Sequence, residues 1–206
     1  MNIKSIKTEL SKYIDVDYFV RFLLLLLALR YFNVFYIAIV DQKGLIYSSF
    51  LDNYLNYISW IRNSVLYSSN AITHAMGINS YVSLPFYLKT VNGSYVEMVY
   101  DCLGLGLMSF WVAFVVANKE SLKRKITWCA GGIICMWFIN CWRVALLLIA
   151  LENHWKLNSI LDHHTLFNIV AYSLILIMIY LYTKDGKKVK VTEKSRLSKY
   201  SLLTRW

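Results

Sequence analysis

Four long apolar runs constrain this chain more than any other feature. They cover residues 18–40, 103–117, 126–150 and 166–182. A helix rises ~1.5 Å per residue, so about twenty apolar residues match the ~30 Å hydrocarbon core of a bilayer. Hydrophobic residues make up 58% of the sequence, more than an ordinary soluble domain contains. We therefore predict an all-α integral membrane protein with about four transmembrane helices.

The positions of the basic residues predict how these helices are oriented. Of the 22 lysines and arginines, 16 lie in residues 1–21, 118–125 or 183–206, and 4 lie in residues 41–101 or 151–165. In membrane proteins the cytoplasmic segments carry the excess of basic residues. We therefore expect this protein in the cytoplasmic membrane, with both termini in the cytoplasm. The net charge of +10 is explained in this way, and nucleic-acid binding is not expected.

One membrane-embedded domain is expected over residues 1–182. Residues 183–206 form a basic cytoplasmic tail, which is expected to bind anionic lipid. The segment between the first two apolar runs is expected to cover the extracytoplasmic end of the domain. Its first part, residues 41–77, carries apolar side chains at helical spacing, which predicts an amphipathic helix in the membrane interface, with a further span as the alternative. The apolar positions are Leu51, Leu55, Ile58, Ile61 and Val65, and the polar ones assigned to the other face are Asp52, Asn53, Asn56, Arg62 and Asn63.

A short β-hairpin is predicted in the second part of this segment, residues 81–100. Asn92-Gly93 lies between alternating and β-branched residues, which is a strong hairpin signal. Pro85 fits an edge position in such a sheet. The second strand would lead directly into Asp101 and Cys102.

Side chains of three chemically useful kinds are expected near the extracytoplasmic boundary. Cys102 precedes the second apolar run, and His163 and His164 precede the last. Arg143 lies 17 residues beyond Ile126 on a helix that runs outward, which places it ~25 Å from the inner boundary. A thiol, a guanidinium and an imidazole from three helices would thus reach about the same depth.

This set of groups can carry nucleophilic catalysis. A thiol attacks as the thiolate, which a neighbouring arginine or histidine stabilises. Histidine can take the thiol proton and return it to a leaving amine, and arginine can stabilise an oxyanion. Gly104 and Gly106 would let a substrate backbone approach the cysteine, although small residues in membrane helices also serve close packing. Arg30, deep in the first run, must face other helices or water, and it either assists substrate capture or forms an internal ion pair.

The residues reached so far resemble those of the exosortase/archaeosortase family. The resemblance covers residues 81–182 and rests on Cys102-x-Gly104 after a hairpin strand, Asn140-x-x-Arg143 in an apolar helix, and a histidine before the last span. It implies a multi-pass cysteine transpeptidase that cleaves C-terminal sorting signals of exported proteins through a thioester and transfers the proteins to a surface anchor. Partners would be membrane-tethered substrates and an acceptor nucleophile, lipid or glycan.

The resemblance also assigns roles to individual residues. Cys102 would be the nucleophile, Arg143 its thiolate or oxyanion partner, and His164 or His163 the base. Gly104, Asn140 and Arg30 would contribute to substrate binding, and no cofactor is expected. The sequence departs from the family pattern at Leu103, where many members have serine, and at Asn168-Ile169, where glycine and tryptophan are common. The second departure leaves two alignments of the histidines, one selecting His164 and the other His163.

Two other functions agree with the same sequence. A membrane thiol-disulfide carrier would pair Cys102 with Cys141, although no CxxC motif is present. A non-catalytic scaffold or lipid-binding protein would need none of these groups for chemistry. A metal site formed by His163 and His164 with Asp162 and His154 is not expected, because neighbours in sequence rarely bind one ion together and no spaced pair of ligands supports it.

Overall fold

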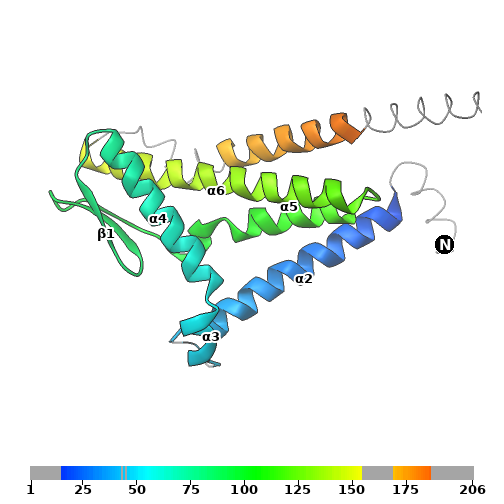
Figure 1. Ribbon diagram of the computed structural model, residues 1–206, viewed down its shortest axis with the longest axis horizontal. Coiled ribbons are helices and arrows are strands. Elements are labelled where there is room, and N and C mark those ends of the chain that lie inside the picture. The colour runs from blue at the N-terminus through cyan, green and yellow to red at the C-terminus, as the bar shows by residue number, and fades with distance from the viewer. Residues whose placement is uncertain (1–14, 43, 45, 155–168, 187–206) are drawn as a thin grey trace, which may run out of the picture. The chain divides into compact units, whose positions relative to one another are not determined.

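The computed structural model describes residues 15–42, 44, 46–154 and 169–186 (Figure 1). Most of these residues are helical, and a small antiparallel sheet of three strands accompanies the helices. The chain divides into two units, Met1–Asn158 and Ser159–Trp206. The second unit contributes one described helix, Ile169–Gly186, and all other described elements belong to the first. The expected single domain over residues 1–182 stays a prediction.

Three of the described helices are long and apolar enough to cross a membrane. They are α2 (Val16–Val40), α6 (Leu122–Glu152) and the helix Ile169–Gly186. The apolar helix α5 (Leu105–Ala117) has only 13 residues, or about 20 Å, which is less than a bilayer core requires. The membrane character predicted from the sequence is therefore supported, while the count of four spans stays a prediction.

The predicted amphipathic helix is interrupted and forms two helices. These are α3 (Ser49–Tyr54) and α4 (Tyr57–Ala75). The interruption falls at Asn56, whose side-chain oxygen accepts a hydrogen bond from the Ser59 amide at 2.9 Å and so caps α4. Asparagine at this position satisfies an amide that a continued helix would have bonded to its own backbone.

The prediction that Asn56 and Arg62 lie on an outward polar face is wrong. Both side chains are buried, with 6% and 4% exposed. Asn56 is buried because it caps α4 and donates to the Asp52 carboxylate at 2.7 Å. Arg62 is buried because the helical register places it between Ile58 and Val65, which face the core.

The sheet has the order β1-β2-β3, with all pairs antiparallel. Its strands are β1 (Ser80–Ser83), β2 (Tyr87–Thr90) and β3 (Tyr95–Glu97). The hairpin predicted at Asn92-Gly93 is confirmed as the β2–β3 connection, where Gly93 adopts a φ of 101° that favours glycine. Strand β1 was not predicted, and Pro85 lies in the turn between β1 and β2 rather than on an edge strand.

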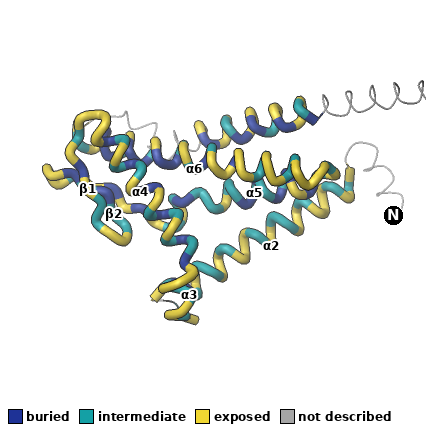
Figure 2. Tube along the Cα trace, viewed as in Figure 1, coloured by how far each residue is buried: buried dark blue, intermediate teal, exposed yellow. Residues whose placement is uncertain are grey.

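The core of the first unit lies where α4, α6 and the sheet meet. Figure 2 shows the buried stretches of these elements in dark blue. The buried cluster contains Ile58, Val65 and Leu66 from α4, Leu88, Val96 and Met98 from the sheet region, Leu103, and Cys141, Val144 and Leu148 from α6. The sheet is also tied to the end of α6, because Thr90 donates to the Glu152 carboxylate at 2.8 Å.

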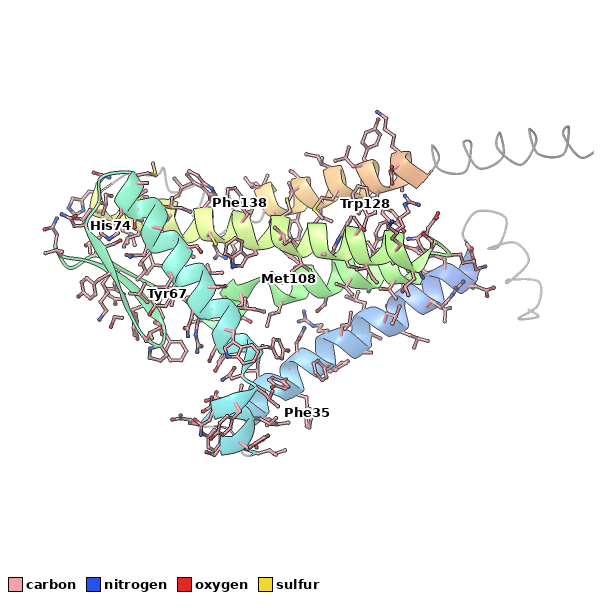
Figure 3. The ribbon with its side chains drawn as sticks, in the orientation of Figure 1. Phe35, Tyr67, His74, Met108, Trp128 and Phe138 are labelled. Carbon is pink, nitrogen blue, oxygen red and sulfur yellow. The ribbon has the colours of Figure 1, made fainter. Side chains whose placement is uncertain are left out.

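Helix α5 is held between α2 and α6. On the α6 side, the Trp111 indole donates to the Trp128 carbonyl at 2.9 Å, and a side chain on Gly132 would overlap the Trp111 ring. On the α2 side, Asn33 donates to the Ser109 hydroxyl at 2.9 Å and accepts from the Tyr57 hydroxyl at 2.7 Å. These contacts fix the start of α5 relative to three other helices, and Met108 marks this part of α5 in Figure 3.

Candidate active site

A short 3-10 turn, η1 (Tyr100–Leu103), presents Cys102 between β3 and α5. Leu103 anchors the turn, because its side chain is fully buried in the core. The Cys102 amide donates to the Val99 carbonyl at 3.0 Å, which closes the turn. Gly104 then adopts a φ of 72°, a left-handed conformation that lets α5 begin directly after the turn. The glycine expected to admit a substrate therefore has a backbone role of its own.

The structure places Arg143 beside the cysteine. One guanidinium nitrogen, Nη2, donates to Cys102 Sγ at 3.6 Å, although the two residues are 41 positions apart in the sequence. Both side chains are partly exposed, so the contact lies at the edge of the core and not within it. The thiolate is the form of a cysteine that attacks electrophiles, and a guanidinium beside the sulfur can donate a hydrogen bond to it.

Asn140 holds the backbone of the same cysteine. Its Nδ2 donates to the Cys102 carbonyl at 2.9 Å, and its side chain is 4% exposed. Asn140 and Arg143 are three residues apart on α6 and therefore share one face of that helix. The side-chain oxygen of Asn140 is buried and has no hydrogen-bond partner among the described residues. The Asn-x-x-Arg pair thus contacts the cysteine through its backbone and its sulfur.

Arg30 lies over the first turn of α5. A Cβ added to Gly106 would be 3.6 Å from Arg30 Nη1, which is ordinary van der Waals contact. Both residues are exposed in the first unit. Arg30 is therefore near the helix that follows the cysteine, as a substrate-binding role would require, and Gly106 is not made necessary by helix packing at this point.

The predicted histidines, His163 and His164, lie outside the described residues. Their distance from Cys102 and the choice between them stay predictions. Among residues 15–42, 44, 46–154 and 169–186, no group of three or more histidine, cysteine or acidic side chains is arranged to hold a metal ion.

The other cysteines of the described chain have different surroundings. Cys141 is 1% exposed and belongs to the core, and all four cysteines are free thiols. The Ser69 hydroxyl donates to the Cys141 carbonyl at 2.9 Å and ties α4 to α6 at that level. Among the hydrogen bonds of the described residues, a guanidinium donates to the sulfur of Cys102 and to no other cysteine sulfur.

Sequence reasoning missed Arg62 as part of this region. Its guanidinium carbon lies 5.7 Å from the centre of the Tyr100 ring, which belongs to the same turn as Cys102. The signal that could have identified it was its register, four residues after Ile58 and three before Val65, on the apolar face of the predicted helix.

Comparison with protein-family models, curated proteins and solved structures gave no match. The functional reading of the site therefore rests on its residues and their geometry.

Proposed function

We propose that this protein is a membrane cysteine transpeptidase of the exosortase type, with Cys102 as nucleophile and Arg143 as its cationic partner. The observation that carries the proposal is the 3.6 Å contact between Arg143 Nη2 and Cys102 Sγ at the start of an apolar helix. An arginine within an apolar helix is costly unless it has a function or a partner. A contact with a partly exposed thiol gives it both.

The proposed reaction begins with attack of the Cys102 thiolate on a peptide carbonyl carbon. A C–S bond forms and the carbonyl π electrons move to oxygen, where Arg143 stabilises the oxyanion. Collapse of this intermediate breaks the C–N bond, and the leaving amine takes the proton that a base removed from the thiol. The resulting thioester is then attacked by an acceptor nucleophile, which releases the thiolate again. His164 or His163 is the proposed base.

Asn140 would hold the nucleophile and receive the substrate. Its bond to the Cys102 carbonyl supports the first role. In the second role its side-chain oxygen, which is buried and has no partner among the described residues, would accept a substrate N–H after the site opens to uncover it. Arg30 and Gly104 would line the approach to the sulfur from the side of α5.

The proposed substrates are exported proteins that end in a sorting motif, a transmembrane helix and a basic cluster. Three candidate spans support an encounter inside the bilayer. The distribution of basic residues supports a site on the extracytoplasmic face of the cytoplasmic membrane, with both termini and the tail 183–206 inside. The acceptor is proposed to be a lipid or glycan nucleophile.

Trapping an acyl-enzyme tests this function. The protein is co-expressed with candidate substrates that carry a C-terminal helix and basic cluster, and the peptide containing Cys102 is analysed by mass spectrometry. We expect a thioester on Cys102 and cleaved substrate, both of which disappear in Cys102→Ser but persist in the matched variant Cys135→Ser. Substrate processing that survives Cys102→Ser would end the enzyme hypothesis and favour a scaffold or lipid-binding role.

A thiol-disulfide carrier is the second candidate. It is favoured by one observation, that Cys102 packs against the core cluster that contains Cys141. Rapid thiol trapping in cells separates the two functions. A carrier forms a Cys102–Cys141 bond during turnover, whereas a transpeptidase keeps Cys102 available for alkylation.

A further inference from the structure

Arg62 on α4 is a buried cation with few polar contacts. Its side chain is 4% exposed, and its only hydrogen bond among the described residues goes from Nη2 to the Ser59 hydroxyl at 3.0 Å. Nε and Nη1 have no hydrogen-bond partner there, and no ion pair to Arg62 is found within the described part of the chain. Burying a charge without an ion pair is costly, so the position needs an explanation other than stability.

Two aromatic rings cover the Arg62 guanidinium. Its central carbon lies 4.3 Å from the centre of the Phe86 ring and 5.7 Å from the centre of the Tyr100 ring. Both distances are within the range of cation–π attraction, which is stronger where water is excluded. Arg62 therefore connects α4 to two separate points of the chain.

These two points both lie at the C-terminal end of β3, the strand that leads to the cysteine. Phe86 precedes β2, and its carbonyl accepts a hydrogen bond from the Met98 amide at 2.7 Å, directly after β3. Tyr100 is the first residue of η1, two positions before Cys102. The η1 turn is thus held by Arg62 at its beginning and by buried Leu103 at its end, with Cys102 between them.

The contact between Cys102 and Arg143 depends on where this turn lies. The sulfur-to-nitrogen distance is 3.6 Å, and Arg143 belongs to α6 while the sulfur belongs to the turn. A turn that moves relative to α6 loses the contact. Since Arg62 is on α4, which packs against α6, it can fix the turn in the same frame as Arg143.

We infer that Arg62 is a positioning residue for Cys102, which acts through Tyr100 and Phe86 to keep the sulfur beside Arg143. The inference deepens the proposed function, because it takes Cys102 to be the reactive thiol of that site. It requires no substrate for its test, since the reactivity of the thiol can be measured directly.

The charged groups around the turn come from each element that packs near it. Among the described residues they include Arg143 on α6, Arg62 on α4, Arg30 on α2 beside Gly106, Glu97 on β3, Asp101 in the turn itself, and Asp52 on α3, whose charge acts on Arg62. Each of these charges can influence the reactivity of the thiol. The test therefore combines substitutions of Arg62 and Arg143 and does not rely on a single variant.

The test measures alkylation of Cys102 by iodoacetamide in the full-length protein in detergent micelles. Mass spectrometry gives the alkylation rate of Cys102 near pH 7 and near pH 10. The rate near pH 7 divided by the rate near pH 10 reports the thiolate fraction independently of how accessible the sulfur is. We expect Arg62→Met to lower this ratio by roughly fivefold, because the Arg143 contact is weakened. In an Arg143→Met background, Arg62→Met should cause no further loss.

Matched variants separate positioning from general destabilisation. Ser69→Ala removes another buried polar contact of α4, the bond to the Cys141 carbonyl, without touching the turn, and should leave the ratio unchanged. If Arg62→Met does not fold, Tyr100→Leu and Phe86→Leu remove the rings while keeping Arg62, and both should lower the ratio. A ratio within twofold of wild type in these variants, an equal loss in Ser69→Ala, or an undiminished effect in the Arg143→Met background would overturn the inference.

The two proposals fail in different experiments. If alkylation depends on Arg62 but no substrate is processed, Arg62 positions a reactive thiol and the transpeptidase function is lost. If processing requires Cys102 but alkylation and processing ignore Arg62, the transpeptidase stands and the positioning role is lost.

Discussion

Cys102 and Cys141 belong to the same unit of this protein but have opposite surroundings. Cys102 lies in a 3-10 turn, is partly exposed, and has a guanidinium nitrogen 3.6 Å from its sulfur. Cys141 lies within α6, is 1% exposed, and packs with Val144 and Leu148 in the core. Both residues are cysteines, so the residue type does not separate a candidate nucleophile from a packing residue. The difference lies in the turn that holds Cys102 and in the cation beside its sulfur.

The largest expected effect is on substrate processing. Cys102→Ser should lower the rate of sorting-signal cleavage by roughly 10³-fold or more, because the nucleophile itself is replaced. Cys141→Ser should leave the rate per folded molecule within a few-fold of wild type, since its sulfur lies in the core. Processing followed by immunoblot checks both. Equal losses in the two variants would contradict the distinction between the cysteines.

The second prediction concerns stability, for which a substitution of Cys141 is expected to matter more than one of Cys102. Cys141→Ser replaces a buried sulfur by a more polar hydroxyl, for which Ser68 is the neighbouring polar side chain, and should cost about 1 kcal/mol of unfolding free energy. Cys102→Ser, in a partly exposed turn, should change the unfolding free energy by less than about 0.5 kcal/mol. Unfolding in detergent, followed by circular dichroism, measures both values. A Cys102→Ser variant as unstable as Cys141→Ser would identify Cys102 as a structural residue.

The third prediction concerns the cation that distinguishes the two sites. Arg143→Met should slow alkylation of Cys102 near pH 7 by about tenfold, because the thiolate loses its partner. Alkylation of Cys141 should not change. Arg21→Met is a matched control, since Arg21 is an exposed arginine near the start of α2 that donates to the Asp17 carbonyl. An unchanged rate at Cys102 would mean that the 3.6 Å contact has no influence on the thiol.

The smallest expected effect comes from a carboxylate away from both cysteines. Burial acts to raise the pKa of Asp52, but hydrogen bonds from Asn56, Tyr47 and Gln42 and the more distant charge of Arg62 outweigh it, so the pKa is lowered. The ionised form therefore stabilises the folded protein above the ordinary carboxyl pKa, and this contribution disappears as the pH falls through the lowered value.

Asp52→Asn should thus cost at most about 1 kcal/mol near pH 7, because the site is largely open to solvent. The difference from wild type should shrink as the pH falls below the ordinary carboxyl pKa and vanish once the pH is below the lowered pKa of Asp52. Thermal unfolding across this range provides the measurement, and the alkylation of Cys102 and Cys141 serves as the control that neither cysteine is affected. A cost that persists unchanged at low pH would show that the charge of Asp52 is not what stabilises the joint between α2, α3 and α4.

Parts of the fold with local causes could be predicted from the sequence. The apolar runs predicted membrane-spanning helices because length and hydrophobicity are properties of a continuous segment. Asn92-Gly93 predicted its hairpin because the turn itself requires a positive φ. Counting residues along oriented spans predicted a similar depth for Cys102 and Arg143, and their 3.6 Å contact agrees with that prediction. The first two of these inferences needed no knowledge of how distant segments pack.

The features that were missed depend on which partners the side chains and strands find in the folded chain. Strand β1 exists because it pairs with β2, and the break before α4 exists because Asn56 finds Asp52 and Ser59. The charge of Arg62 indicated an outward position, although its register between Ile58 and Val65 indicated a buried one, and the rings of Phe86 and Tyr100 cover its guanidinium. The bond from Asn140 to the Cys102 carbonyl was likewise invisible in the sequence.

The 13 residues of α5 have a consequence for where the chemistry would occur. At about 20 Å, this helix is roughly 10 Å shorter than a hydrocarbon core, so with its last residue at the membrane face of the basic loop 118–125, as proposed, its first residue would lie below the opposite face. A sulfur attached to its recessed end would meet a substrate chain as it leaves its own anchoring helix, without extraction from the lipid. Because bulk water is scarce at that depth, the acylated sulfur would persist long enough for an amphiphilic acceptor to arrive by lateral diffusion.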